Sequence, residues 1–102
     1  MYGYGFFVMT RRKHIDKYEG LWTASEAGVR TYFTVNNLGK VTECAPNGTP
    51  IEGGRTANLS IYTENRFKIT NYFTAITNQE YFNKQFDSDL YVAGNVYLRK
   101  LK

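Results

Sequence analysis

Side-chain alternation with a period of two is the feature of this sequence that most restricts its fold. Across residues 29–36, apolar or β-branched side chains at the odd positions alternate with side chains such as Arg30 and Tyr32 at the even positions. In an extended chain one set faces a core and the other faces solvent. Asn37-Leu-Gly39 then supplies turn residues, and residues 40–44 return as a partner strand. The segment predicts an antiparallel hairpin.

The same alternation predicts two further hairpins. They pair residues 59–63 with 67–69, and residues 90–93 with 96–101. Shorter runs at residues 4–10 and 21–24 are also typical of strands, and residues 15–18 permit one helical turn. Residues 45–54 have no period and contain two prolines and three glycines, which predicts a loop.

One segment carries a helix signal instead. Thr77-Asn-Gln-Glu80 has the pattern of a capping box, in which the threonine hydroxyl and the glutamate carboxylate each accept from an unpaired backbone N–H. Phe82 and Phe86 follow with a spacing of four, which places both rings on one face of a helix. The segment predicts a short helix near residues 78–86.

Together these signals predict an α+β, mainly β fold. A chain of 102 residues matches one domain, residues 1–102, with one core. We expect an antiparallel meander sheet of five to seven strands, with the short helix near residues 78–86 packed on it. The sequence contains no apolar run of the length that a membrane helix needs, and its single cysteine cannot form an internal disulfide. We therefore expect a cytoplasmic protein.

Residues with catalytic chemistry are scarce. The chain has one histidine, His14, and one cysteine, Cys44, and the two are thirty positions apart. Such a pair could form a nucleophile and base, but a cysteine in a strand is more often buried packing. Asp87 and Asp89 could bind a hard cation, but they more plausibly form a turn. We expect no enzymatic activity, no metal and no cofactor.

Positive charge is concentrated at the two ends of the chain. The net charge is +4. Residues 1–17 carry four cations against Asp16, the last four residues carry three more cations, and the segment between them is slightly acidic. If the ends meet in the fold, they form a patch that attracts phosphate or an acidic protein surface. The alternative is that basic termini simply keep a small protein soluble.

Aromatic residues, which make up 17% of the chain, suggest the kind of partner. Cations interleave with tyrosines at Arg30-Thr-Tyr32 and at Tyr97-Leu-Arg99-Lys100, as in proteins that bind single-stranded nucleic acid. The competing explanation is core packing, which we expect for Phe6, Phe33, Phe67, Phe82 and Phe86. The predicted function is therefore a non-enzymatic module that binds nucleic acid, and the alternative is a protein-interaction factor. The predicted binding residues are Arg11, Arg12, Lys13, Lys17, Arg30, Tyr32, Tyr97, Arg99, Lys100 and Lys102.

Two resemblances add to these expectations. The phrases Tyr32-Phe-Thr-Val-Asn-Asn-Leu-Gly-Lys-Val41, Asn71-Tyr-Phe-Thr74 and Thr77-Asn-Gln-Glu80 resemble a pattern in small uncharacterised proteins of phages and mobile elements, over residues 30–85. That resemblance implies a small accessory protein that binds a partner, for example an inhibitor of a host defence complex. Gly20-Leu-Trp22 resembles the early strand of lipocalin-like barrels, although the chain looks short for eight strands.

Overall fold

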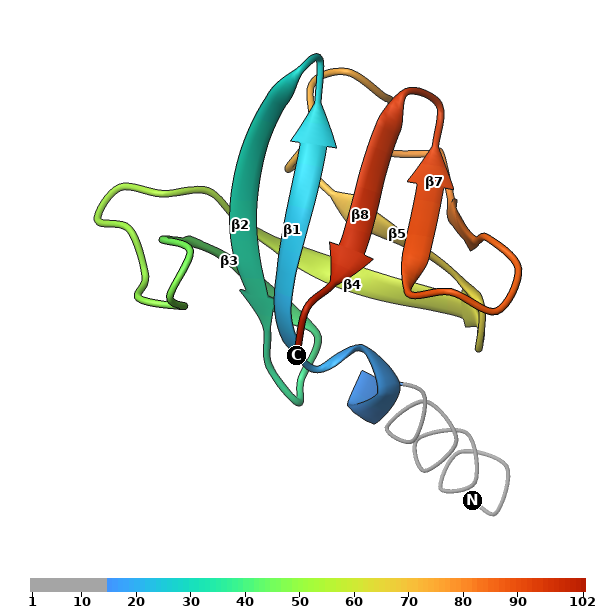
Figure 1. Cartoon of the computed structure of the whole chain (residues 1–102), viewed down its shortest axis with the longest axis horizontal. Coiled ribbons are helices and arrows are strands. Elements are labelled where there is room, and N and C mark those ends of the chain that lie inside the picture. The colour runs from blue at the N-terminus through green and yellow to red at the C-terminus, as the bar shows by residue number, and fades with distance from the viewer. Residues whose placement is uncertain (1–14) are drawn as a thin grey trace, which may run out of the picture.

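In the computed structural model, which describes residues 15–102, eight antiparallel strands follow one another around a closed barrel (Figure 1). Each strand pairs with its neighbours in the sequence, and the last strand pairs with the first. The strands are β1 Gly20–Glu26, β2 Val29–Val35, β3 Lys40–Cys44, β4 Thr56–Thr63, β5 Arg66–Thr70, β6 Phe82–Lys84, β7 Leu90–Ala93 and β8 Val96–Lys100.

The expectation of five to seven strands is wrong, although the expected mainly β, antiparallel architecture is confirmed. The described residues contain one short helix, but it lies at residues 15–18. A chain of this length closes eight strands because its strands are short, from three residues in β6 to eight in β4. Tight turns such as Ala27-Gly28 and Gly94-Asn95 join neighbouring strands with few residues. Closure also leaves no sheet edge to be protected. The expectation that the chain is short for eight strands is therefore wrong.

The three predicted hairpins are confirmed as β2–β3, β4–β5 and β7–β8. The single helical turn at residues 15–18 is confirmed, and so is the loop between β3 and β4. The predicted strand at residues 4–10 and the core position of Phe6 lie outside the described residues. Within residues 15–102, no helix is long and apolar enough to cross a membrane.

The helix predicted near residues 78–86 is wrong. The capping contacts do form, because the Gln79 N–H donates to Thr77 Oγ1 and the Thr77 N–H donates to Glu80 Oε1, each at 3.3 Å. They close only one turn, after which the chain extends into β6. Phe82 is fully buried opposite Phe67 of β5, so pairing with the β5 edge outweighs the local helix signal.

Phe86 lies outside the core, in the turn that follows β6. Its side chain is 96% exposed and its φ is +55°, a backbone conformation of turns. The expectation of a core position is therefore wrong for Phe86, while it is confirmed for Phe33, Phe67 and Phe82, which are all fully buried.

Trp22 occupies the centre of the barrel interior. It is fully buried, and its ring lies 5.4–6.2 Å, centroid to centroid, from the rings of Tyr18, Phe33, Phe67 and Tyr91. Its indole Nε1 donates a hydrogen bond of 2.8 Å to the carbonyl oxygen of Tyr18. Aromatic side chains therefore fill the barrel, and one hydrogen bond links its centre to the helical turn.

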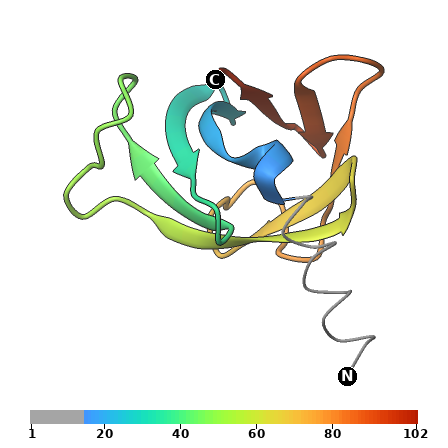
Figure 2. The same cartoon turned by 90° about the horizontal axis from the view of Figure 1, so that it is seen from below.

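The helical turn at residues 15–18 lies across one opening of the barrel (Figure 2). Ile15 and Tyr18 are buried there, and the Tyr18 hydroxyl donates to the carbonyl oxygen of Glu64 in the β4–β5 turn. Lys17 Nζ donates to the same carbonyl and to Asn65 Oδ1, both at 2.7 Å. The opening is thus closed by contacts that join the start of the described chain to its middle.

Replacing Trp22 tests the central hydrogen bond. In Trp22→Phe the carbonyl oxygen of Tyr18 loses its buried donor, and a smaller ring leaves part of the interior unfilled. We expect a loss of about 2 kcal/mol or more in the free energy of unfolding, measured by urea denaturation followed by circular dichroism. A loss below about 0.5 kcal/mol would show that the indole N–H contributes little.

Gly20 admits no side chain. Its φ is +139°, and a Cβ there would lie 2.7 Å from the backbone of Lys102, which crosses beside it. We expect Gly20→Ala to lower the thermal midpoint of unfolding more than the matched change Gly28→Ala. Gly28 also has a positive φ, +80°, but a Cβ at that position meets open space. Equal effects of the two substitutions would rule out the close approach as the cause.

Candidate nucleic-acid interface

The carboxylates of the strands share the inward register, whereas most cations of the strands lie on the outer wall. Side chains alternate between the interior and the outer wall along each strand. The carboxylates within strands are Glu26 and Glu43, which share the inward register of Trp22 and Phe33 respectively. The other carboxylates of the described chain lie in turns, loops or the helical turn. Outward positions of the strands carry the cations Arg30, Lys40, Arg66, Lys68 and Arg99. Two further strand cations, Lys84 and Lys100, share the inward register at the last residues of β6 and β8.

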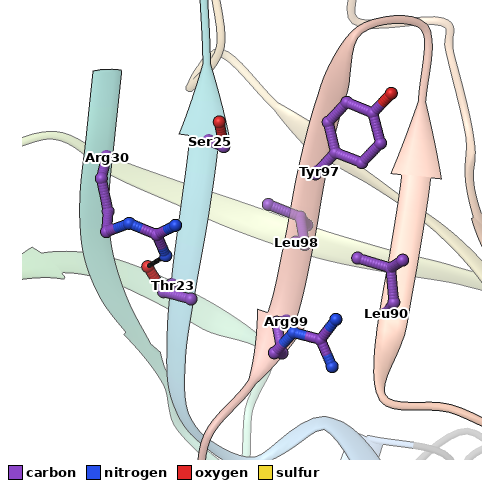
Figure 3. Close-up of a pocket in the computed structure, with 7 residues that line it drawn as sticks. All are labelled: Thr23, Ser25, Arg30, Leu90, Tyr97, Leu98 and Arg99. Atoms are coloured by element: carbon purple, nitrogen blue, oxygen red, sulfur yellow. Dashed lines mark hydrogen bonds between the residues drawn. The ribbon is translucent and has the colours of Figure 1, made fainter. Parts of the chain in front are cut away.

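Three of the predicted binding residues meet on the outer wall around β1. Strand β1 pairs with β2 on one side and with β8 on the other, so Ser25 stands opposite both Arg30 and Tyr97. Arg99 stands opposite Thr23 in the next outward row. These five residues, which we call the β1 face, line a shallow hollow of about 170 Å³ together with Leu90 and Leu98 (Figure 3).

Hydrogen bonds fix one side of this hollow. Arg30 extends from β2 to β1 and donates from Nη1 to Thr23 Oγ1 at 3.2 Å, and Thr23 Oγ1 donates in turn to the carbonyl oxygen of Thr31 at 3.1 Å. Arg99 lies on the opposite side and extends toward Leu90 of β7 (Figure 3). Tyr97 is 48% exposed. The β1 face therefore combines two guanidinium groups, two hydroxyls and one accessible aromatic ring.

The other predicted residues lie near this face or outside the described chain. Tyr32 lies in the outward row of Thr23 and Arg99. Lys100 and Lys102 lie beside Gly20, so the end of the chain meets the start of β1 at the opening that contains Lys17. Lys17 itself bonds the β4–β5 turn and is not part of the β1 face. Arg11, Arg12 and Lys13 lie outside the described residues.

A second cationic and aromatic surface was missed by the sequence analysis. We call Tyr62, Arg66, Lys68 and Tyr81 the β5 face. The Arg66 guanidinium lies 5.1 Å from the ring centroid of Tyr62 and 4.7 Å from that of Tyr81, and Lys68 Nζ lies 5.7 Å from the latter. The spacing Arg66-x-Lys68 on a strand indicates two cations on one face of the sheet. The predicted helix near residues 78–86 includes Tyr81, so the sequence does not place its ring beside these cations.

At the opposite opening of the barrel, the strand carboxylates are neutralised. Arg55 binds Glu43 with two hydrogen bonds, of 3.1 and 3.2 Å, and lies 3.4 Å from Glu26. Its guanidinium also lies 4.2 Å from the ring centroid of Tyr72. The second Glu26 oxygen accepts from the backbone N–H groups of Thr74 and Ala75, at 2.6 and 3.0 Å. This network fastens the β5–β6 loop to the barrel.

The network shifts the pKa of both carboxyl groups. The hydrogen bonds from Arg55 hold the pKa of Glu43 below its usual value. Burial by itself raises the pKa of Glu26, but the donors from Ala75, Thr74 and Arg55 outweigh that effect, so its pKa is also lowered. Both carboxylates are therefore ionised at neutral pH, and both accept hydrogen bonds from these donors. Because they lie on the inner side of the barrel and are neutralised by Arg55, neither repels an anion on the outer wall.

The residues considered for chemistry lie apart from these faces. Cys44 is buried, and its burial together with the nearby Glu43 raises the pKa of the thiol. Asp87 and Asp89 lie exposed in the loop between β6 and β7, while His14 is outside the described residues. Within residues 15–102, no three His, Cys, Asp or Glu side chains are close enough together to hold a metal ion.

Comparison with protein-family models, with curated proteins and with solved structures finds no match to this chain. The resemblance to proteins of phages and mobile elements stays a prediction.

The carboxylate network predicts a stability that falls in acid. Because the native pKa values of Glu26 and Glu43 lie below 4.5, the unfolded chain takes up protons first as the pH falls. The stabilisation is complete above about pH 5 and is lost as the pH drops through the native pKa values. We expect the urea concentration at the midpoint of unfolding, followed by Trp22 fluorescence, to be lower at about pH 3 than at about pH 7.

The matched variant for this test is Glu26→Gln. It keeps the size of the side chain but has no carboxyl group to titrate, so its urea midpoint should depend less on pH than that of the native chain. An unchanged pH dependence in Glu26→Gln would assign the acid sensitivity to other carboxylates.

Proposed function

We propose that this protein is a non-enzymatic module that binds nucleic acid through the β1 face. The observation that carries the proposal is the division of charge on the barrel. Outward positions of its strands present Arg30, Arg99 and other cations, whereas the strand carboxylates Glu26 and Glu43 turn inward and are bound by Arg55. A cationic wall without strand carboxylates attracts a polyanion.

The geometry of the β1 face suits a sugar–phosphate backbone. Arg30 and Arg99 lie on either side of β1, with two strand spacings, about 10 Å, between β2 and β8. Guanidinium groups bind phosphate oxygens with two parallel donors, and the Thr23 hydroxyl holds Arg30 in place. Tyr97, being half exposed, offers a ring on which a base can stack. The face therefore has groups for both parts of a nucleotide.

A protein partner on the same surface is the second candidate, including an inhibitor of the kind that the phage resemblance implies. The specific observation in its favour is that the outward positions of β7, next to Arg99, are Leu90 and Val92. Apolar side chains beside an exposed tyrosine and an arginine are typical of the centre of a protein interface. Salt separates the two candidates, because only phosphate binding releases many counterions.

The test is a titration of a labelled single-stranded oligonucleotide, followed by fluorescence anisotropy at several salt concentrations. Arg30→Ala combined with Arg99→Ala should weaken binding. It should also flatten the slope of log affinity against log salt by about 0.7 for each phosphate that the variant no longer binds. Lys40→Ala is the matched control, since Lys40 is an exposed strand cation outside the β1 face.

If the native chain fails to bind the oligonucleotide even at low salt, the proposal is contradicted. A protein partner would then be the favoured candidate. If Lys40→Ala had the same effect as the double variant, binding would depend on overall charge and not on the β1 face.

A further inference from the structure

The β5 face lies on the far side of the barrel from the β1 face. Strand β5 stands four places from β1 in the closed order of eight strands, and β4 and β5 run behind β1 and β8 in Figure 1. The residues of the two faces come from different strands and share no side chain. A ligand on the β5 face is therefore a separate binding event from a ligand on the β1 face.

Local backbone structure builds the β5 face from three neighbouring segments. The pairing of β4 with β5 shifts register between Ile61 and Thr63, which marks a bulge at Tyr62. Tyr62 continues the outward row of Asn58 and Ser60 along β4, and its side chain is 61% exposed. Its ring lies 5.2 Å from that of Tyr81, which directly precedes β6, so the two rings form one aromatic surface.

Arg66 is held on that surface but is not neutralised. Its guanidinium lies over both tyrosine rings, which restrains the side chain without using up its donors as a carboxylate would. Throughout residues 15–102, the ion pairs are those of Arg55 with Glu26 and Glu43. Within that part of the chain, Arg66 and Lys68 therefore stand as unpaired cations next to the exposed ring of Tyr62 and the half-buried ring of Tyr81.

The surroundings of the β5 face favour nucleic acid over a protein. Its neighbours at outward positions are small or polar, namely Thr56, Asn58, Ser60, Thr70 and Asn83. The aliphatic and phenylalanine side chains of the same strands, such as Leu59, Phe67 and Ile69, belong to the core. The centre of a protein interface is usually apolar, whereas unpaired cations beside aromatic rings suit phosphates and bases.

We propose that the β5 face is a second binding site, which takes single-stranded nucleic acid by stacking bases on Tyr62 and Tyr81 while Arg66 and Lys68 contact the adjacent phosphates. The inference rests on the proposed function only in its class of ligand, nucleic acid. The residues of the β5 face are different from those of the β1 face. Duplex bases are already stacked on each other, so the site selects unpaired strands. With a site on each side, one barrel can contact two strands at once.

The experiment compares two labelled probes of equal length: an oligothymidylate, and a strand of abasic sites that keeps the phosphates and lacks the bases. Fluorescence anisotropy gives the affinity of each probe for the native chain and for Tyr62→Ala. We expect Tyr62→Ala to weaken binding of the oligothymidylate by about five- to a hundredfold, and to leave the abasic strand unaffected. Tyr62→Phe is the matched control, because it keeps the ring and should bind both probes like the native chain.

The outcomes separate this inference from the proposed function. If Tyr62→Ala binds the oligothymidylate as the native chain does, or loses affinity equally for both probes, the stacking site is overturned. In that case, weakened binding by the Arg30→Ala and Arg99→Ala double variant would still support the β1 face. If the native chain binds neither probe at low salt, both proposals fail. Tyr62 is exposed, and a thermal unfolding curve for each variant serves as the check that its fold is retained.

Discussion

One buried hydrogen bond, from the indole N–H of Trp22 to the carbonyl oxygen of Tyr18, connects the centre of the barrel to its end. It joins the helical turn at one opening to the centre of the interior, where Trp22 contacts four other aromatic rings. Tyr18 in turn bonds the β4–β5 turn, so strands from both halves of the chain are connected through these two residues. In an interior filled by large rings, such a directional contact selects one arrangement among many of similar packing.

Closure of the barrel determines where the charges lie. Because β1 pairs with both β2 and β8, Arg30 and Arg99, distant in sequence, stand on either side of one strand. Closure also turns Glu26 and Glu43 inward, where Arg55 neutralises them and the β5–β6 loop is fastened. The outer wall is thus left cationic although the middle of the sequence is slightly acidic. A linear count of charge misses this division, because the outer wall consists of alternate residues and excludes the turns.

Sequence patterns predicted most of the strands and none of the closure. The β2–β3 hairpin was predictable because its alternation and its turn residues agree with each other. Strand β6 was not, because Thr77 and Glu80 form capping contacts in isolation and only the unpaired edge of β5 draws Phe82 into the sheet. The β1 face was predicted in part through Arg30, Tyr97 and Arg99. The β5 face was missed, since its tyrosines come from segments nineteen positions apart in the sequence.

The sequence by itself determined a mainly β chain with an aromatic core, since alternation and turn residues act between near neighbours. It also determined that positive charge is in excess, at +4 for the whole chain. The tertiary structure alone decided the number of strands, the burial of Phe82 with the exposure of Phe86, and the grouping of cations into two faces. The physical reason is that strand pairing is a contact between distant segments. Its partner and register depend on closing the whole barrel around Trp22, which no local pattern records.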